Sequence, residues 1–170
     1  MEWLGCFVTI TVQGQLRGCI GQVVPRQPLH RAVPLLAIRA AREDRRFQPI
    51  ETHELGDLRI EISVLGPLAP LDSRSPEKVL ARLQPGELGV FLQCQGRSAT
   101  YLPQVWRHLP DPVDFMDSLS RKAGLPPLAW RHPDALISVY EVLAFTEEAT
   151  MKAKSHPTSQ AKQTKPAQDK

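Results

Sequence analysis

The residues best suited to chemistry lie in one hexapeptide, Leu16-Arg17-Gly18-Cys19-Ile20-Gly21. A guanidinium beside a thiol favours the thiolate, which attacks electrophiles and binds metals, so Arg17 and Cys19 could form a reactive site. Glycine in a strand often marks a place where another group approaches the backbone closely, which makes Gly18 and Gly21 candidate ligand-contacting positions. The alternative is structural, because free cysteine is among the most commonly buried residue types and often only fills space.

The elements around the hexapeptide must hold it in place. Phe7–Val12 and Gln15–Val24 flank the turn residues Gln13-Gly14, which predicts a β-hairpin. Side chains alternate along a strand, so Arg17 and Cys19 are expected on one face, about 7 Å apart along the chain. Apolar periodicity and capping residues predict the remaining elements. Helices are expected over 29–40, 76–83 and 112–123, and strands over 58–64, 89–94, 97–102 and 136–145.

Length and composition fit one globular domain followed by a tail. The chain has 170 residues, of which 42% are hydrophobic and 23% charged, as is ordinary for a domain with a real core. Residues 1–148 are assigned to this domain. Residues 149–170 are rich in Lys, Gln, Ser, Thr and Pro and have almost nothing to bury, so a disordered basic tail is expected there.

The charge and cysteine content exclude several function classes. The net charge is +3, but five lysines lie in the tail, and the rest of the chain has 16 basic and 17 acidic residues. Such a body does not imply binding of nucleic acid. No apolar run approaches the ~20 residues of a spanning helix and the N-terminus is a poor signal peptide, so a cytoplasmic protein is expected. Three cysteines without C-x-x-C spacing argue against a disulfide framework and a metal site, and no cofactor is evident.

Five motifs, in the right order, resemble the AMMECR-like domain family, also called protein A of the AmmeMemoRadiSam system. They are Phe7-Val8-Thr9 with the hexapeptide, Glu43-Asp44-Arg45-Arg46-Phe47 with Pro49, Ile60-Glu61-Ile62-Ser63-Val64-Leu65, Leu102-Pro103-Gln104-Val105, and Arg121-Lys122-Ala123-Gly124-Leu125-Pro126 with Trp130. The resemblance covers about residues 5–146. It implies an α+β fold, with helices packed against a mostly antiparallel β-sheet, and genomic association with a Memo-like and a radical-SAM protein. It implies no particular reaction.

The same motifs hold five further polar candidates for a site. Glu61 lies on the polar face of a strand, where it could act as a base, hold an arginine or be solvated. Asp44 and Arg46 could belong to a site or lock a turn. Gln104 could hydrogen-bond a ligand or cap its own segment. Lys122 could contact a ligand, but the last turn of a helix favours a cation in any case.

Two classes of function follow if these candidates share one cleft with Arg17 and Cys19. The first is a binding or accessory module that acts with Memo-like and radical-SAM partners through the face around Cys19. The second is an enzyme in which Cys19 is the nucleophile, supported by Arg17 and by Glu61 or Asp44. The lack of an obvious general base favours the binding module, and the sequence leaves the oligomeric state open.

The start of the chain raises an expectation about exposed surface. The family resemblance implies a helical segment before the first strand, whereas this chain begins almost at the strand. Strand alternation predicts Phe7 and Ile20 on one face of the hairpin, and Val8 and Ile10 on the other. Such a hairpin is normally covered on both sides. An exposed apolar patch is therefore expected beside it, unless a helix from elsewhere in the chain fills the place.

Overall fold

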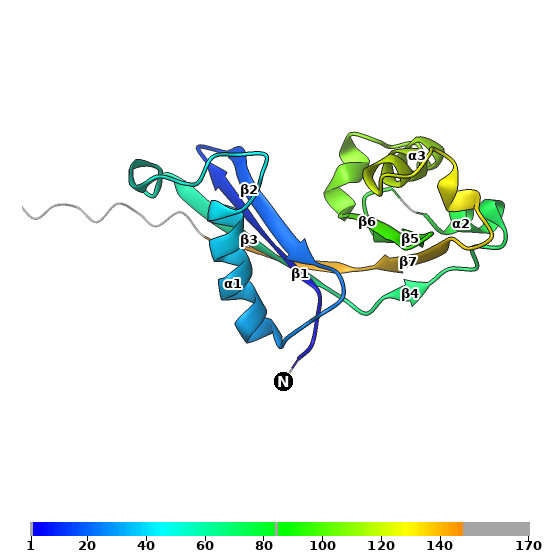
Figure 1. The fold of residues 1–170 in the computed structure, drawn as a ribbon, viewed down its shortest axis with the longest axis horizontal. Helices are drawn as coiled ribbons and strands as arrows, with labels where there is room; N and C mark the ends of the chain where they lie inside the picture. The colour runs from blue at the N-terminus through cyan, green and yellow to red at the C-terminus, as the bar shows by residue number, and fades with distance from the viewer. Residues whose placement is uncertain (1, 84, 148–170) are drawn as a thin grey trace, which may run out of the picture.

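The strands form two four-stranded antiparallel sheets (Figure 1). The computed structural model describes residues 2–83 and 85–147, so the expected tail lies outside the described residues. Sheet A contains, in spatial order, β2 (Gln15–Gln22), β1 (Cys6–Val12), β3 (Leu58–Leu65) and β8 (Val142–Thr146). Sheet B contains β4 (Ala69–Pro70), β7 (Leu136–Tyr140), β5 (Gly89–Cys94) and β6 (Arg97–Tyr101).

Helices cover one face of each sheet. They are α1 (Leu29–Arg42), α2 (Pro76–Arg82) and α3 (Pro112–Lys122), with the short 3-10 helices η1 (Thr52–Glu54), η2 (Pro103–Arg107) and η3 (Ala129–Arg131). Figure 1 shows α1 against sheet A and α3 against sheet B. None of the helices in the described part of the chain is both long and apolar enough to cross a membrane.

Each sheet has its own core, and a third cluster joins them. In sheet A, Ala32 and Leu36 of α1 pack with Val8 of β1. In sheet B, the rings of Trp106 and Phe115 stack with centroids 3.6 Å apart within a larger apolar cluster. Between the sheets, buried Leu65, Phe91, Leu102 and Tyr140 pack together with the partly buried Phe7 and Val23. Apolar burial therefore fixes both sheets and their junction.

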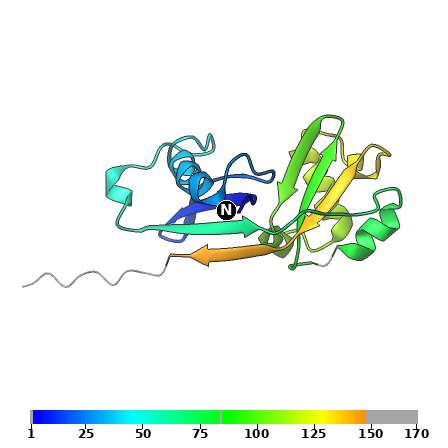
Figure 2. The same cartoon turned by 90° about the horizontal axis from the view of Figure 1, so that it is seen from below.

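The α+β class predicted from the sequence is confirmed, but one predicted strand is wrong. The segment 136–145 does not form one strand, because the chain leaves sheet B after Tyr140 and enters sheet A at Val142. Figure 2 shows this passage from β7 into β8. The apolar pattern is continuous because both strands are extended, so it gave no sign that the two halves pair with different neighbours.

The first hairpin contains a β-bulge that the alternation rule did not anticipate. On β1, the adjacent residues Ile10 and Thr11 pair with Gly18 and Leu16 of β2. Arg17, between these two partners, is therefore an extra residue on β2. Beyond it, Val8 pairs with Ile20 and Phe7 with Gly21. The expectation that Phe7 and Ile20 share a face is therefore wrong. One extra residue shifts the register and moves every later side chain of β2 to the other face.

The expected apolar patch does not lie at this hairpin. Val8 and Ile10 are fully buried on the α1 side, and Phe7 packs on the other side into the cluster that joins the sheets. Sheet B therefore supplies the second cover. Among the exposed large apolar side chains of sheet A, Leu16 lies near the turn of the hairpin, whereas the more exposed Leu143 (62%) and Phe145 (54%) lie on the far edge strand.

A glycine-to-alanine substitution tests how closely α1 approaches β2. A Cβ at Gly18 would collide with the backbone oxygen of Ala40, which cannot move without moving the helix. We expect Gly18→Ala to lower the free energy of unfolding by about 2–3 kcal/mol, as overpacking does. The matched control is Gly56→Ala, where the added Cβ meets nothing within 4 Å. Equal stability of the two variants in urea denaturation would contradict this contact.

Candidate functional site

The bulge at Arg17 decides where Cys19 lies. Without the extra residue, Cys19 would face Val8 beneath α1. With it, Cys19 pairs with Thr9, and its half-buried thiol lies on the face of sheet A away from α1. Thr9 Oγ1 donates a hydrogen bond to Cys19 Sγ at 3.4 Å. Thr9 also pairs with Glu61 of β3, so Cys19, Thr9 and Glu61 form a row across three strands.

The two candidate glycines serve packing. Gly18 lies under α1 at Ala40, where a side chain would collide with the helix backbone. Gly21 lies against the ring of Phe7, and a Cβ there would collide with that ring. Their spacing around Cys19 therefore reflects close approach of a helix on one face and of an aromatic ring on the other.

Asp44 connects the loop after α1 to the backbone of Cys19. Its buried carboxylate accepts hydrogen bonds from the Cys19 amide at 2.8 Å and from Arg46 Nη2 at 2.6 Å and Nε at 2.9 Å. The Arg46 backbone amide donates to it as well. The hydrogen bonds from the Arg46 side chain, and then from the two amides, hold the pKa of Asp44 far below its usual range although burial acts in the opposite direction. Asp44 thus locks the loop onto β2.

Arg17 does not occupy the position expected for it beside Cys19. Its Nε and Nη2 donate to the Glu54 carboxylate at 2.7 and 2.9 Å, and its Nη1 donates to the carbonyl of Gln48 at 2.6 Å. The hydrogen bonds from Arg17 lower the pKa of Glu54. The one-face expectation failed because Arg17 is the bulged residue, and this side chain anchors the 48–54 loop instead of supporting the thiol.

Two other cations, Arg46 and Lys122, lie near Cys19. Burial is the main effect that lowers the pKa of Lys122. The charge of Arg46 lowers this pKa further, and Cys19 raises it. Cys19 also contributes to the raised pKa of Arg46, whose main cause is the hydrogen bond to Asp44. The Lys122 ammonium donates to the Thr100 carbonyl at 2.8 Å and lies 4.6 Å from the centroid of the Tyr101 ring. The end of α3, which packs on sheet B, therefore contributes a cation to the Cys19 face of sheet A.

Glu61 and Gln104 line a separate cavity. It has a volume of about 270 Å³ and lies between the open face of sheet A and η2, with Arg107 also at its wall. Adjacent strands lie about 4.8 Å apart, so Glu61 is about 10 Å from Cys19 across the sheet. The structure therefore divides the candidates between two neighbouring places on one face, rather than gathering them in one cleft.

The sequence reasoning missed several residues of this region. Thr9, the partner of the Cys19 sulfur, could have been found once the register was known, because it alternates with Phe7 and Thr11 on β1. Nothing in the local sequence marked Glu54 or Arg107, which reach the region only through tertiary contacts. Among the described residues, no group of three or more His, Cys, Asp or Glu is placed to hold a metal ion.

Comparison with known proteins decides the family. The AMMECR1 family model matches residues 2–145. The chain belongs to the AMMECR1 family. Protein MK0488 of Methanopyrus kandleri is 38% identical over 155 residues, which cover 86% of this chain and 73% of that protein. Protein TK0174 of Thermococcus kodakarensis is 37% identical over 155 residues, covering 86% and 74%.

A solved structure supports the AMMECR1 fold in three dimensions. The crystal structure of uncharacterized protein PH0010 from Pyrococcus horikoshii matches with a TM-score of 0.79 at 34% identity. The match covers 86% of this chain and 75% of PH0010. The resemblance inferred from the five motifs is therefore confirmed for both the family and the fold.

The Asp44 lock has a testable pH dependence. We expect Asp44→Asn to lower the free energy of unfolding at neutral pH by about 2–3 kcal/mol, because the Arg46 guanidinium and the Cys19 amide lose a charged acceptor. The folded-state pKa of Asp44 is depressed, so this stabilisation is complete above the unfolded value of about 3.9 and is lost as the pH falls below it. The stability difference between wild type and variant should therefore narrow in acid.

The control for this prediction is Asp57→Asn at an exposed carboxylate that accepts from Gln13. Its effect on stability should be small at every pH. A stability difference between wild type and Asp44→Asn that stays constant from neutral pH to pH about 2 would contradict the depressed pKa of Asp44.

Proposed function

We propose that this AMMECR1 domain is a binding or accessory module that acts with Memo-like and radical-SAM partners through the face around Cys19. The partner classes come from the family resemblance. The role of the face rests on one observation: the carboxylate nearest to Cys19 is fully engaged in structure. Asp44 accepts hydrogen bonds from the Cys19 amide and from the Arg46 side chain and backbone.

A carboxylate in this state is a poor general base. Its pKa lies far below neutrality, so it has little tendency to take a proton from a thiol. The Cys19 sulfur receives its hydrogen bond from Thr9, a neutral hydroxyl donor. Glu61 lies on the same face but about 10 Å away, two strand spacings from Cys19. These positions support binding better than nucleophilic catalysis.

The charges around Cys19 suggest what the partner presents. Arg46 is 57% exposed although Asp44 fixes its guanidinium in place, and Lys122 is held by Thr100 and Tyr101. Two preorganised cations beside a half-buried thiol favour an acidic group on the partner. Because Arg46 belongs to the loop after α1 and Lys122 to the end of α3, the partner would contact both halves of the domain.

A second candidate function keeps Cys19 as the nucleophile of an enzyme. The observation that favours it is the same pair of cations, because positive charge near a thiol favours the reactive thiolate. In this alternative Glu61 is the available acid or base, whereas Arg17 and Asp44 are already occupied. The pH dependence of Cys19 alkylation distinguishes the two: a thiol that reacts fast well below pH 8 supports the enzyme.

Substitution of the thiol tests the binding module directly. We expect Cys19→Ser to change the free energy of unfolding by no more than about 1 kcal/mol, because little volume is removed. The same variant, and Lys122→Ala, should weaken binding to the Memo-like or radical-SAM protein of the same genome about tenfold, measured by calorimetry.

The control for this test is Arg31→Ala, an exposed position on α1, which covers the opposite face of sheet A. It should leave the affinity unchanged. Equal affinity of wild type, Cys19→Ser and Lys122→Ala would place the partner surface elsewhere and reject the proposal.

A further inference from the structure

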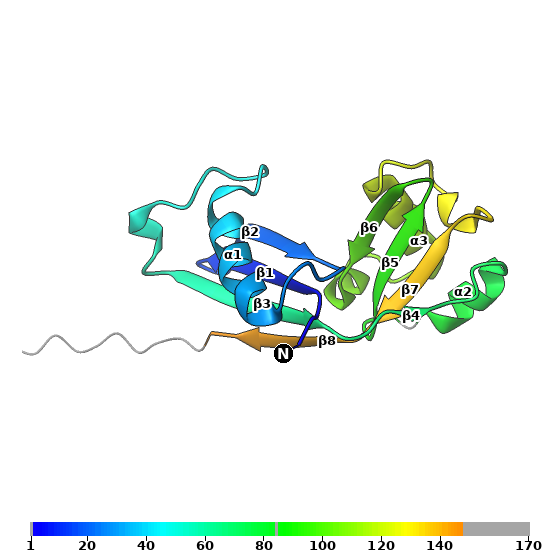
Figure 3. The same ribbon diagram turned by 60° about the horizontal axis from the view of Figure 1, so that its bottom comes forward.

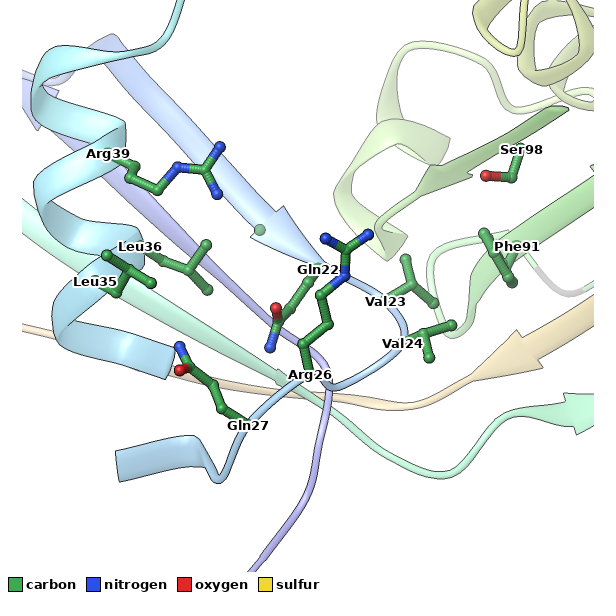
Figure 4. Close-up of a pocket in the computed structure, with 11 residues that line it drawn as sticks. Gln22, Val23, Val24, Arg26, Gln27, Leu35, Leu36, Arg39, Phe91 and Ser98 are labelled. Carbon is green, nitrogen blue, oxygen red and sulfur yellow. The ribbon is translucent and has the colours of Figure 1, made fainter. Parts of the chain in front are cut away.

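A second cavity lies beyond Cys19, at the end of β2. It has a volume of about 610 Å³, within the range of small-molecule sites. Its wall combines α1, the end of β2 with the loop that follows, and strands β5 and β6 of sheet B (Figure 4). Figure 3 shows β2 and β6, the edge strands of the two sheets, facing the space between them. The polar side chains of this cavity are not those that surround Cys19.

Two arginines reach the cavity, and one of them is paired with an acidic residue outside its wall. Arg26 comes from the loop after β2 and Arg39 from α1, and Figure 4 shows both side chains extending into the same space. Arg39 donates through Nε to Glu43 at 2.8 Å, which leaves its terminal Nη groups for a ligand. No acidic residue of the described chain is among those that line the cavity. Guanidinium groups arranged in this way suit the oxygens of a carboxylate or a phosphate.

Gln22 supplies an independent sign that a ligand belongs here. Its side chain lines the cavity, and its Nε2 atom is buried without a hydrogen-bond partner among the described residues. A buried donor without a partner is unfavourable, and such groups in native proteins usually have an acceptor. Because this atom has almost no accessible surface, the amide must rotate toward the cavity before an oxygen of a bound anion can accept from it.

Part of the wall is apolar. Val23, the buried Leu36 and the buried Phe91 come from three different elements and line the same cavity. A ligand that consisted only of an inorganic ion would leave this surface unused. The cavity therefore favours a molecule with an apolar body as well as an anionic group.

We propose that this cavity binds a small organic anion in which a carboxylate or phosphate is attached to an apolar or aromatic body. The anionic group is bound by Arg26 and Arg39, one of its oxygens accepts from Gln22 Nε2 once that amide has rotated toward the cavity, and the body packs on Val23, Leu36 and Phe91. Because Phe91 belongs to sheet B and the other residues to the sheet A side, the bound ligand connects the two halves of the domain. This site is separate from the Cys19 face and does not depend on the function proposed for that face.

Four probes define the ligand chemistry: phenyl phosphate, benzoate, inorganic phosphate and phenol. Binding is followed by nuclear magnetic resonance through the side-chain amide signal of Gln22 in the full chain. We expect one or both aromatic anions to shift this signal, inorganic phosphate to bind more weakly, and phenol to have no effect. The comparison of phenyl phosphate with benzoate identifies the preferred anion. No shift with either aromatic anion at about 10 mM would overturn the proposal.

Matched variants locate the binding groups. Arg26→Gln and Arg39→Gln should each weaken binding of the preferred probe about tenfold or more, whereas Arg31→Gln on the same helix should not. Gln22→Leu should raise the melting temperature of the free protein, because it removes a buried donor without a partner, and the preferred probe should raise the melting temperature of this variant less than that of the wild type. Cys19→Ser should leave probe binding unchanged. Equal affinity of Arg26→Gln, Arg39→Gln and Arg31→Gln would overturn the assignment.

Discussion

The contact between Gly18 of β2 and Ala40 of α1 is the constraint on which the arrangement around Cys19 depends. A helix can lie this close to a strand only where the strand has no side chain. The bulge at Arg17 is what brings Gly18, rather than Arg17, under the helix opposite Ile10. The same register shift returns Ile20 to the α1 side and turns Cys19 to the open face. One extra residue therefore sets both the core packing and the exposure of the thiol.

Asp44 makes this arrangement rigid, but its carboxylate then has little tendency to accept a proton. Its carboxylate ties the loop after α1 to the Cys19 amide and fixes the Arg46 guanidinium beside the same strand. The hydrogen bonds that make it a good connector also keep it ionised and occupied. Arg17 is used in a similar way, since its pairing with Glu54 anchors the 48–54 loop. Arg17 and Asp44, two of the polar candidates for a site at the thiol, thus serve the fold, which is why the face suits binding more than proton transfer.

The junction between the two sheets creates the places where ligands and partners can act. Leu65, Phe91, Leu102 and Tyr140 hold the sheets together through a small apolar cluster. Around it lie two cavities that combine residues of sheet A with residues of β5 and β6 in one case and of η2 in the other. Lys122 reaches the Cys19 face from the end of α3, and Phe91 reaches the wall beside Gln22. Sites at such a junction respond to any change in the relative position of the sheets.

The sequence by itself determined the family, the α+β class, the hairpin and most elements, because these follow from local periodicity, turn residues and short motifs. It also singled out the hexapeptide, Asp44 and Arg46. Only the tertiary structure decided that Cys19 faces Thr9 instead of Val8, that Arg17 pairs with Glu54, and that the segment 136–145 is divided between two sheets. The physical reason is that the period of two residues along a strand shows which side chains alternate. A single bulge, however, moves every later side chain of the strand to the opposite face of the sheet. Partners 37 residues apart leave no local pattern.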